Sequence, residues 1–462
     1  MRNDTERALA EAMANADVGS VLGDLLRVGI LVRSDGGLAL GNDVDLQTLR
    51  LFWPLLSEFG PRLRPVRIAG CPVHFCTGLV NAVAGAKAHE PAVSGRMASG
   101  GQGASAGLAA IACLGEMAER ISLFIRPDGT DERLQSRCDT LLDLDAGAFL
   151  GFSPAQTRAL WGRIAGAELQ SDGGPHEWSA LSDDRVHVTH MRTGQSAQLA
   201  AFAVMLGGGQ AHPPFLGSTV GSAVHGTIEE ATRRALLELA ERDAIARAWY
   251  NRLWITSVPG RLVAQNMCSP LADFLEQRAR VTAIFRVQTD LKVHVFAAVS
   301  HAPDGYGGAV GFAAARCVPE AMDGAVREML QGEFSMQLTA QAAKKAGTDP
   351  SHASKALAYG RSVRISDDLK LGEWPAAETS VLERIYGPDE LIESCFDEDI
   401  DLWLFDATRS DLKMPCAKVL SPDLCSWEPR FGKRRLYPKS AFDDPAQRRS
   451  LEEAYSRRPF PF

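Results

Sequence analysis

The chain has 462 residues and a formal net charge of −8, with 45% hydrophobic and 23% charged residues. This composition predicts a folded protein with a sizeable core and excludes a globally disordered chain. Its lysines and arginines form no basic stripe, which excludes nucleic acid as a partner. The polar start lacks an apolar signal segment, no run is long enough to cross a bilayer, and the nine cysteines follow no disulfide rhythm. We therefore predict a cytoplasmic protein without membrane contact.

The first 93 residues predict a small N-terminal extension. One helix starts near residue 5, a second covers Val18–Val28, and two short strands with a glycine turn follow within Gly29–Leu40. This order is that of a fragment of a winged-helix module, and equally that of an ordinary small helical cap. A further amphipathic helix over residues 45–60 should be kinked or split by Pro54, because proline disrupts a helix interior.

Residues 94–462 predict a larger domain in which strands interleave with long helices. The expected fold is α/β or α+β, with layered mixed sheets and helices. In chain order the sequence predicts helices at 104–125 and 157–165, a strand at 197–206, a helix from Thr227, strands at 281–288, 292–300 and 307–315, helices from Pro319 and at 379–386, and strands at 400–407 and 417–421.

Two of these helices carry the same acidic pattern. Leu114–Arg120 and Leu236–Arg242 both follow Leu-x-Glu-x-Ala-Glu-Arg, and a Gly-rich loop is expected before each helix. In the second helix Glu230, Glu238 and Glu241 fall within a sector of about 80°. Carboxylates on one stripe repel one another unless a cation lies among them, and their hard oxygens suit Mg²⁺ bridged to phosphate. One copy would be an ordinary solvated face, but two copies predict acidic helices that converge on a metal–phosphate site.

Three spaced blocks of the sequence, in the same order, resemble the YcaO family. They are Gly101–Ser105 with Ala112–Arg120, then Gly221–Asp243, then Gly311–Ala315 with Pro319–Gln331. The resemblance covers roughly residues 94–462. It implies a YcaO-like, ATP-binding catalytic domain that follows an extension of residues 1–93, with ATP and Mg²⁺ as cofactors.

The resemblance also implies roles for individual side chains. The expected ATP-binding residues are Glu116, Glu119, Arg120, Glu230, Glu238, Glu241 and Arg242. The five glutamates would hold Mg²⁺, and the two arginines would contact phosphate or orient carboxylates, with a structural ion pair as the alternative. In the third block Glu328 and Gln331 occupy matching positions, where a helix-surface role stays open. Gln102 replaces the family's usual lysine and Ala112 a common serine, which removes a cation and a hydroxyl.

The chain ends in Arg457–Phe462, where two prolines restrict the backbone to extended geometry. Azoline-forming members of the family end in a proline-rich motif that reaches the active site. Together with Lys418–Asp423, this tail resembles the cyclodehydratase subunit of microcin-type azole synthetases. Pro461 and Phe462 are therefore the expected catalytic residues.

The function that this resemblance implies is ATP-dependent cyclodehydration. Cys, Ser or Thr of a ribosomally made precursor peptide would become thiazoline or oxazoline after phosphorylation of the backbone amide oxygen. The implied partners are the precursor peptide, a leader-peptide-binding protein and an FMN-dependent azoline dehydrogenase. Two alternatives stay open: a peptide thioamide-forming enzyme, and a non-catalytic scaffold in a peptide-modification complex. The proline-ended tail argues against the first, and the intact carboxylates argue against the second.

Overall fold

The computed structural model describes residues 19–34, 37–81, 96–126, 129–164, 178–207, 216–253, 255–349, 354–368, 371–372, 382–441 and 444–461. The chain divides into two compact units. Unit 1 comprises Met1–Asp131, Ser222–Thr232 and Asp406–Ala417, and unit 2 comprises Glu132–Gly221, Arg233–Phe405 and Lys418–Phe462. Unit 1 includes residues on both sides of position 94, where the sequence predicts a domain boundary, and that boundary stays a prediction.

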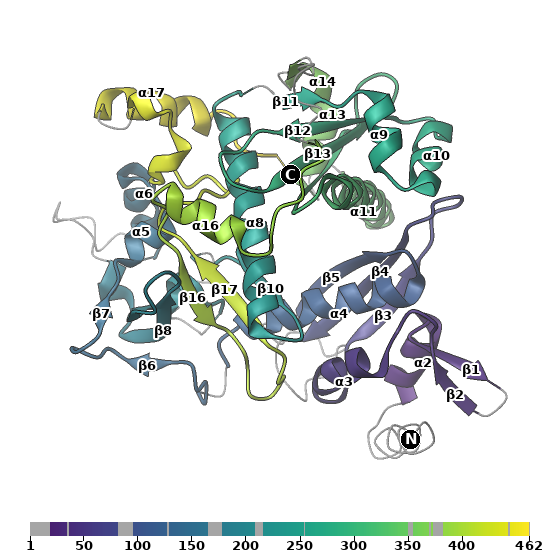
Figure 1. The fold of residues 1–462 in the computed structure, drawn as a ribbon, viewed down its shortest axis with the longest axis horizontal. Coiled ribbons are helices and arrows are strands. Elements are labelled where there is room, and N and C mark those ends of the chain that lie inside the picture. Colours follow the sequence, from purple (N-terminus) through teal and green to yellow (C-terminus); the bar gives the residue numbers. More distant parts are fainter. Residues whose placement is uncertain are drawn as a thin grey trace. The chain divides into compact units, whose positions relative to one another are not determined.

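Unit 1 is built on an antiparallel sheet in which β4 lies between β3 and β5, with α4 packed against it (Figure 1). Its elements are α2 (Gly19–Arg27), β1 (Leu31–Ser34), β2 (Gly37–Leu40), α3 (Leu46–Pro54), η1 (Leu55–Phe59), β3 (Arg62–Val66), β4 (His74–Asn81), β5 (Arg96–Gly103), α4 (Ala106–Leu123) and β10 (Ser222–Val224).

The predicted helix at 18–28, the hairpin after it and the break at Pro54 are confirmed. α3 ends at Pro54 and continues as the π-helical turn η1, because proline cannot donate the hydrogen bond that a regular helix needs there. The helix predicted from residue 5 lies outside the described residues.

The Gly-rich segment before α4 is a strand, so the prediction of a loop there was wrong. A Cβ atom on Gly101 would lie 2.2 Å from the carbonyl oxygen of Ala109 and 2.2 Å from the backbone nitrogen of Cys113. Because glycine has no Cβ, β5 and the backbone of α4 can approach this closely. The glycines in this segment therefore serve helix–strand packing, and the core of unit 1 forms around the buried Leu114 and Met117 of α4.

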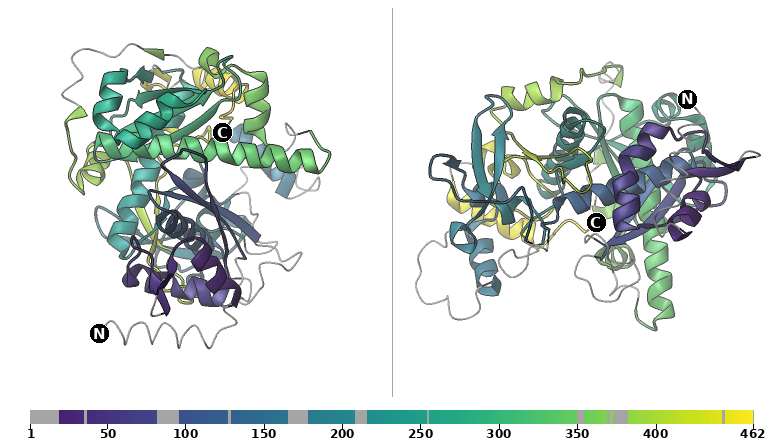
Figure 2. Two further views of the ribbon diagram at one scale, coloured as in Figure 1. Left: turned by 90° about the vertical axis from the view of Figure 1, so that its right-hand side faces the viewer. Right: turned by 90° about the horizontal axis from the view of Figure 1, so that it is seen from below.

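Unit 2 contains an antiparallel meander that leads into a long helix. The sheet order is β14-β13-β12-β11-β15, in which only the last pair is parallel, and α11 packs against β13 and β14 (Figure 2). The elements are β11 (Ile255–Ser257), α9 (Gly260–Asn266), α10 (Ser269–Gln277), β12 (Val281–Val287), β13 (His294–His301), β14 (Ala309–Ala315), α11 (Val318–Lys345), α13 (Lys355–Ser362), α14 (Ile365–Asp368) and β15 (Leu371–Gly372). The three strands and the helix that the sequence predicts in this region are confirmed.

A second sheet of unit 2 runs in the order β17-β16-β8-β9-β7, with β6 beside β8. The elements of this part are β6 (Gln135–Ser136), β7 (Leu142–Asp143), α5 (Ala146–Leu150), α6 (Pro154–Ile164), η3 (Trp178–Leu181), β8 (Asp184–His190), β9 (Ser196–Ala200), α7 (Ala201–Val204), α8 (Ile228–Tyr250), α16 (Glu390–Asp397), β16 (Trp403–Asp406), β17 (Cys416–Leu420), η6 (Arg434–Leu436), η7 (Lys439–Ala441) and α17 (Pro445–Ser456). α8 and β17 belong to unit 2 from Arg233 and Lys418 onward.

Two predicted elements of unit 2 need correction. The strand predicted at 197–206 ends at Ala200 and continues as the short helix α7, because an apolar run alone does not distinguish a strand from a buried helix. Within the helix predicted at 379–386, Leu382 is helical and 383–386 are not, while 379–381 lie outside the described residues. A helix follows later, at Glu390–Asp397, after Pro388, which suits the start of a helix rather than its interior. Within the described ranges, no helix is long and apolar enough to span a membrane.

Candidate functional site

In unit 1, Glu116 of α4 is hydrogen-bonded to the preceding strand. The backbone N–H of Gly100 in β5 donates to Glu116 Oε2 at 2.8 Å. The other oxygen, Oε1, forms an ion pair with Arg120 one helical turn later. Arg120 in turn donates to the carbonyl oxygen of Ala98, at 2.5 Å. The structure therefore brings together Glu116 and Arg120, two predicted site residues, at the edge where β5 meets α4.

The next two predicted glutamates of unit 1 lie near the start of α8. Glu119 accepts a hydrogen bond of 2.8 Å from the hydroxyl of Ser222 in β10. Glu230 lies in the first turn of α8, and its backbone N–H donates to Thr227 Oγ1 at 3.3 Å. That bond makes Thr227, from which the sequence predicts the helix, the N-cap of α8.

In unit 2, Glu238 repeats the contact that Glu116 makes. Its Oε2 accepts from the backbone N–H of Gly221 at 3.0 Å, and its Oε1 accepts from Arg242 Nη2 at 3.1 Å. Gly221 has a φ of +78°, and a Cβ there would lie 2.6 Å from the carbonyl oxygen of Val419. Only glycine fits this position without strain, so the glycine fixes the N–H that orients Glu238.

Glu241 is the most deeply buried of the predicted carboxylates. It accepts from the backbone N–H of Ala314 at 3.1 Å, and Arg242 Nε lies 3.8 Å from its other oxygen. Burial raises the pKa of Glu241 to about 8; the charge of Arg242 opposes the rise, and the carboxylates of Glu328 and Glu238 add to it. A cation among these carboxylates would relieve that repulsion and favour the ionised form.

Glu328, from the third sequence block, belongs to the same neighbourhood. The backbone N–H of Phe312 in β14 donates to Glu328 Oε2 at 2.6 Å. Its charge acts on Glu241, so the two carboxylates lie near each other in unit 2. Glu328 is half-buried, and its role in the site stays a prediction. The sequence pattern placed Glu328 and Gln331 at matching positions, but it did not identify the contact to β14.

Arg242 presents unsatisfied donors beside these carboxylates. Its Nε and Nη1 atoms are buried and make no hydrogen bond within the described part of the chain, although its Nη2 binds Glu238. The guanidinium lies 3.2 Å from the ring centroid of Trp427. A planar fork of N–H donors held in place by an aromatic face is suited to an oxyanion such as phosphate.

The C-terminal tail packs on Trp427 as well. The ring of Phe460 stacks on that of Trp427, with centroids 5.1 Å apart and planes inclined by 11°. Trp249 of α8 contacts Phe460 edge-on at 5.3 Å, and Phe312 of β14 lies 5.8 Å from it. The tail is therefore anchored on elements that also carry Arg242, Glu241 and the N–H partner of Glu328.

The predicted catalytic residues follow directly after this anchor. Pro461 is next to Phe460 in the chain and is half-buried, whereas Phe462 lies outside the described residues. The aromatic anchor itself was missed by sequence reasoning, which assigned no role to Trp427 or Trp249. A usable signal was present, because tryptophan is rare and Trp249 lies two turns after Arg242 on the same helix.

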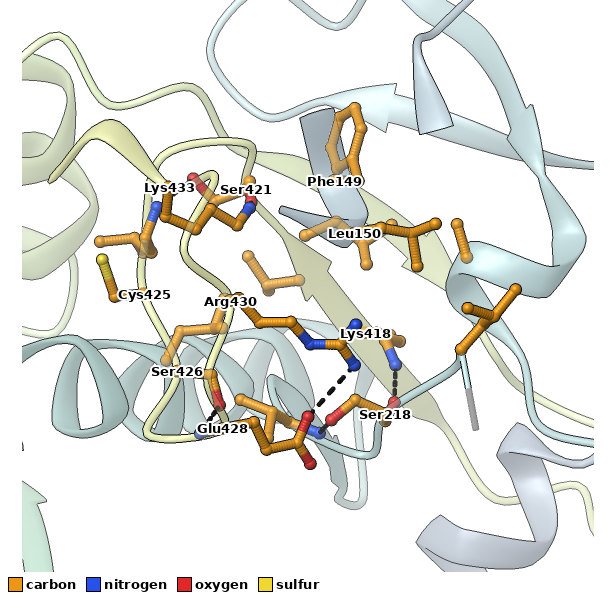
Figure 3. Close-up of a pocket in the computed structure, with 17 residues that line it drawn as sticks. Phe149, Leu150, Ser218, Lys418, Ser421, Cys425, Ser426, Glu428, Arg430 and Lys433 are labelled. Carbon is orange, nitrogen blue, oxygen red and sulfur yellow. Dashed lines mark hydrogen bonds and ion pairs between the residues drawn. The ribbon is translucent and has the colours of Figure 1, made fainter. Parts of the chain in front are cut away.

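A small cavity of about 80 Å³ lies beside α8 (Figure 3). Ser218 and Val220, from the loop that leads to Gly221, are among its lining residues. The Lys418 ammonium group donates to the carbonyl oxygen of Ser218, three residues before Gly221. Arg430 pairs with Glu428 at 3.2 Å and stacks on Phe152. These cations tie loops to one another, so Lys418, in the segment that the sequence singled out, holds the backbone on which Glu238 is oriented.

The residues of the site fit a magnesium nucleotide. Within the described residues, no group of three or more His, Cys, Asp or Glu side chains is arranged to hold a metal ion by protein ligands alone. Mg²⁺ in nucleotide sites, however, uses one or two carboxylates and completes its shell with phosphate oxygens and water. The mutually repelling Glu241, Glu238 and Glu328 supply such carboxylates, and Arg242 supplies unsatisfied donors for phosphate. Each unit offers its own group of acidic residues, and their convergence on one nucleotide stays a prediction.

The structure combines mixed helices and sheets with glutamates that accept hydrogen bonds from backbone N–H groups of the preceding segments. A family model described as "YcaO cyclodehydratase, ATP-ad Mg2+-binding" matches residues 100–425, well over half of the chain. The chain belongs to the YcaO family. The predicted family, fold class and cofactors, ATP and Mg²⁺, are thereby confirmed at the level of the family.

Comparison with solved structures supports the fold. A heterocyclase in complex with substrate and cofactor has a TM-score of 0.66 and 20% identity, over 87% of this chain and 54% of the other. The YcaO protein from Methanopyrus kandleri, bound with AMPPCP and Mg²⁺, has a TM-score of 0.53 and 16% identity, over 82% and 91%. The heterocyclase TruD has a TM-score of 0.53 and 20% identity, over 71% and 47%. This chain thus spans about half the length of the two heterocyclases. A comparison with curated proteins gave no match.

Proposed function

We propose that this protein is an ATP-dependent cyclodehydratase that acts on the backbone of a ribosomally made precursor peptide. A Cys, Ser or Thr side chain adds through its sulfur or oxygen to the preceding amide carbonyl, and its proton leaves. The resulting oxyanion takes the γ-phosphoryl group of ATP, which releases ADP. Loss of phosphate, with a proton from the amide nitrogen, leaves a thiazoline or oxazoline.

The chain's own residues have separable tasks in this scheme. Arg242 binds a phosphate oxygen, because its buried Nε and Nη1 make no hydrogen bond to any described residue. Glu116, Glu119, Glu230, Glu238 and Glu241 are the proposed Mg²⁺ ligands, and Arg120 orients Glu116. Bound Mg²⁺ would offset charge on the phosphate groups. The tail, through the predicted catalytic residues Pro461 and Phe462, would lie by the peptide amide that loses a proton on ring formation.

The observation that carries the azoline proposal is the anchored tail. Phe460 stacks on Trp427, and the Arg242 guanidinium lies over the same indole ring, so the tail and the arginine of the nucleotide site contact one side chain. Neither thioamide formation nor a scaffold function is favoured by any contact among the described residues.

The experiment that tests this proposal separates ATP binding from ring formation. Deletion of residues 459–462 should reduce water loss from the precursor peptide, followed by mass spectrometry, by about 100-fold or more, while ATP affinity changes by less than about threefold. Phe460→Leu keeps an apolar anchor and should retain more activity than the deletion. Glu453→Gln, at an exposed side chain of α17, is the control. Wild-type rates of water loss from the truncated protein would refute the proposal.

The same proposal includes partners. A leader-peptide-binding protein would present the precursor, and an FMN-dependent azoline dehydrogenase would oxidise the azolines to azoles in the cytoplasm. The isolated chain should therefore process its peptide poorly. Addition of the leader-binding partner should restore the rate, and full activity of the purified chain alone would contradict this part of the proposal.

A further inference from the structure

The small cavity beside α8 lies on a different face of that helix from the predicted carboxylates. Among the described residues of α8, Leu239 lines the cavity, whereas Glu238 and Glu241 do not. Successive side chains of a helix point about 100° apart, so these two carboxylates point to other sides of α8. The cavity volume of about 80 Å³ has room for about five water molecules, or for one small polyatomic ion. The cavity is therefore separate from the acidic groups of the nucleotide site.

A buried lysine lines this cavity, and its hydrogen-bond acceptors are all neutral. The Lys433 ammonium group donates to three backbone carbonyl oxygens, at 3.1, 2.8 and 3.0 Å, those of Ala148, Ser421 and Pro422. Burial lowers the pKa of Lys433 to about 8, although the charges of Asp423 and Asp243 oppose the fall. Neither aspartate lines the cavity. Because a buried positive charge is stabilised by a negative charge beside it, this lining favours an anion over water.

A second cation of the lining, Arg430, has an unused donor. Its guanidinium lies 4.0 Å from the ring centroid of Phe152, and its Nη2 donates to Glu428 at 3.2 Å. Its Nη1 is buried and makes no hydrogen bond to any described residue. Figure 3 shows this guanidinium pointing toward Lys418, whose side chain lines the same cavity. Because a buried N–H without an acceptor is unfavourable, an anionic oxygen in the cavity would stabilise Arg430.

We propose that this cavity binds one small tetrahedral oxyanion, phosphate or sulfate. Arg430 Nη1 donates to an oxygen of the anion, and Lys433 supplies a second positive charge. The Ser421 hydroxyl already accepts from the backbone N–H groups of Asp423 and Leu424, so its own hydrogen remains for an anionic oxygen. Sites for larger ligands commonly measure about 300–1,000 Å³, so the volume restricts this cavity to an ion. The site does not depend on the cyclodehydratase proposal.

The test is titration calorimetry of the full chain with sulfate and, separately, with inorganic phosphate. Both titrations contain saturating Mg²⁺ and AMPPCP, so that the nucleotide site is filled and cannot take up the anion. Arg430→Gln removes the unused donor and its charge, and it should weaken binding of either anion by at least about tenfold. Glu428→Gln removes the carboxylate that competes with the anion for Arg430, and it should tighten sulfate binding by about threefold or more.

A matched control and a folding check accompany these variants. Arg449→Gln removes the same charge from an exposed position of α17 that does not line the cavity, and it should leave affinity within about twofold of wild type. Thermal melting verifies that Arg430→Gln folds, and Glu428→Gln, at an exposed residue, tests the site if it does not. Binding of only one of the two anions would identify that anion as the ligand. Absence of binding by wild type, or sulfate affinity that Glu428→Gln leaves unchanged or lowers, would overturn the proposal.

Discussion

The region β5–α4 of unit 1 and the region β14–α11 of unit 2 share one local plan. Each strand is the third of an antiparallel meander and leads directly into a long helix. In each, a glutamate reaches back sixteen residues to a backbone N–H of the strand: Glu116 to Gly100 at 2.8 Å and Glu328 to Phe312 at 2.6 Å. Each strand also has a glycine at the point where helix and strand backbones meet.

The two regions differ in the charge that follows this shared contact. Three residues later α4 carries Glu119 and then Arg120, whereas α11 carries Gln331 and then a glycine. The sequence echo of α4 is instead α8, with the same Glu-x-x-Glu-Arg, although α8 follows only the short strand β10. The strand–helix contact of α4 is thus repeated in α11, whereas its charged sequence pattern is repeated in α8. The strand–helix contact positions a carboxylate, while the residues beside it set the charge of the site.

The largest expected effect comes from the glycines that both regions need. A Cβ at Gly101 would lie 2.2 Å from the Ala109 carbonyl oxygen, and one at Gly311 would lie 2.1 Å from the Met329 nitrogen. Backbone atoms cannot yield as a flexible side chain can, so Gly101→Ala and Gly311→Ala should each cost about 3 kcal/mol or more of unfolding free energy. Urea denaturation measures the loss.

The control for these variants is Gly115→Ala within α4 itself. The nearest atom to a Cβ there is a Val224 methyl carbon at 3.9 Å, so alanine should gain about 0.5–1 kcal/mol through helix propensity. Wild-type stability of Gly101→Ala or Gly311→Ala would show that the two regions do not share this packing.

The second prediction tests the difference in charge. Glu119→Gln should lower Mg²⁺-dependent ATP turnover by about 100-fold, because it removes a proposed metal ligand. Gln331→Ala, at the equivalent position of α11, should lower it by less than about threefold, because a neutral amide contributes no charge there. The measurement is ATPase rate against Mg²⁺ concentration at a fixed peptide concentration. Equal losses of ATP turnover in both variants would contradict the proposed difference in charge between the two helices.

The third prediction uses the pKa of Glu241, which burial raises from its ordinary value of 4.5 to about 8. Between these values the folded protein binds the proton more tightly than the unfolded chain, so this group's stabilisation is complete below about pH 4.5 and is lost as pH rises through 8. Glu241→Gln keeps an acceptor for the Ala314 N–H and removes the buried charge. In magnesium-free buffer the variant should melt above wild type at pH 9, and this gain should shrink at pH 6.

For a chain of this size, each kcal/mol shifts the melting temperature by about 2–4 °C or less. The pH series is therefore read best as the difference between variant and wild type. A difference that stays constant from pH 6 to pH 9 would mean that the Glu241 carboxylate is ionised throughout, and it would remove the argument that a cation is needed beside it.

The smallest effect concerns how the two helices begin. Ser105 caps α4 by accepting from the Leu108 N–H at 3.3 Å, whereas Cys317 precedes α11 without a side-chain capping hydrogen bond. Ser105→Ala should cost about 1 kcal/mol, and Cys317→Ser should gain up to about 1 kcal/mol. Thermal melting checks both, and a loss of stability in Cys317→Ser would show that this thiol contributes packing that the hydroxyl cannot replace.

Local chemistry allowed much of unit 1 and unit 2 to be predicted from the sequence. The cap at Thr227, the break at Pro54 and the strands around residues 281–315 follow from short-range preferences that tertiary contacts reinforce. The acidic pattern on α4 and α8 also appears in the sequence, because helical periodicity determines which side chains share a face. Fold class and family followed from these patterns.

The contacts that orient the site were decided only by the tertiary structure. The partner of Glu116 is a backbone N–H sixteen residues away, and such groups have no sequence signature. Phe460 meets Trp249 across more than two hundred residues, so neither residue predicts the other. The glycines of β5 favour a loop on local preference alone, yet they form a strand because the close approach of α4 excludes any side chain. Local preferences act over a few residues, whereas close packing and burial depend on which distant segments meet.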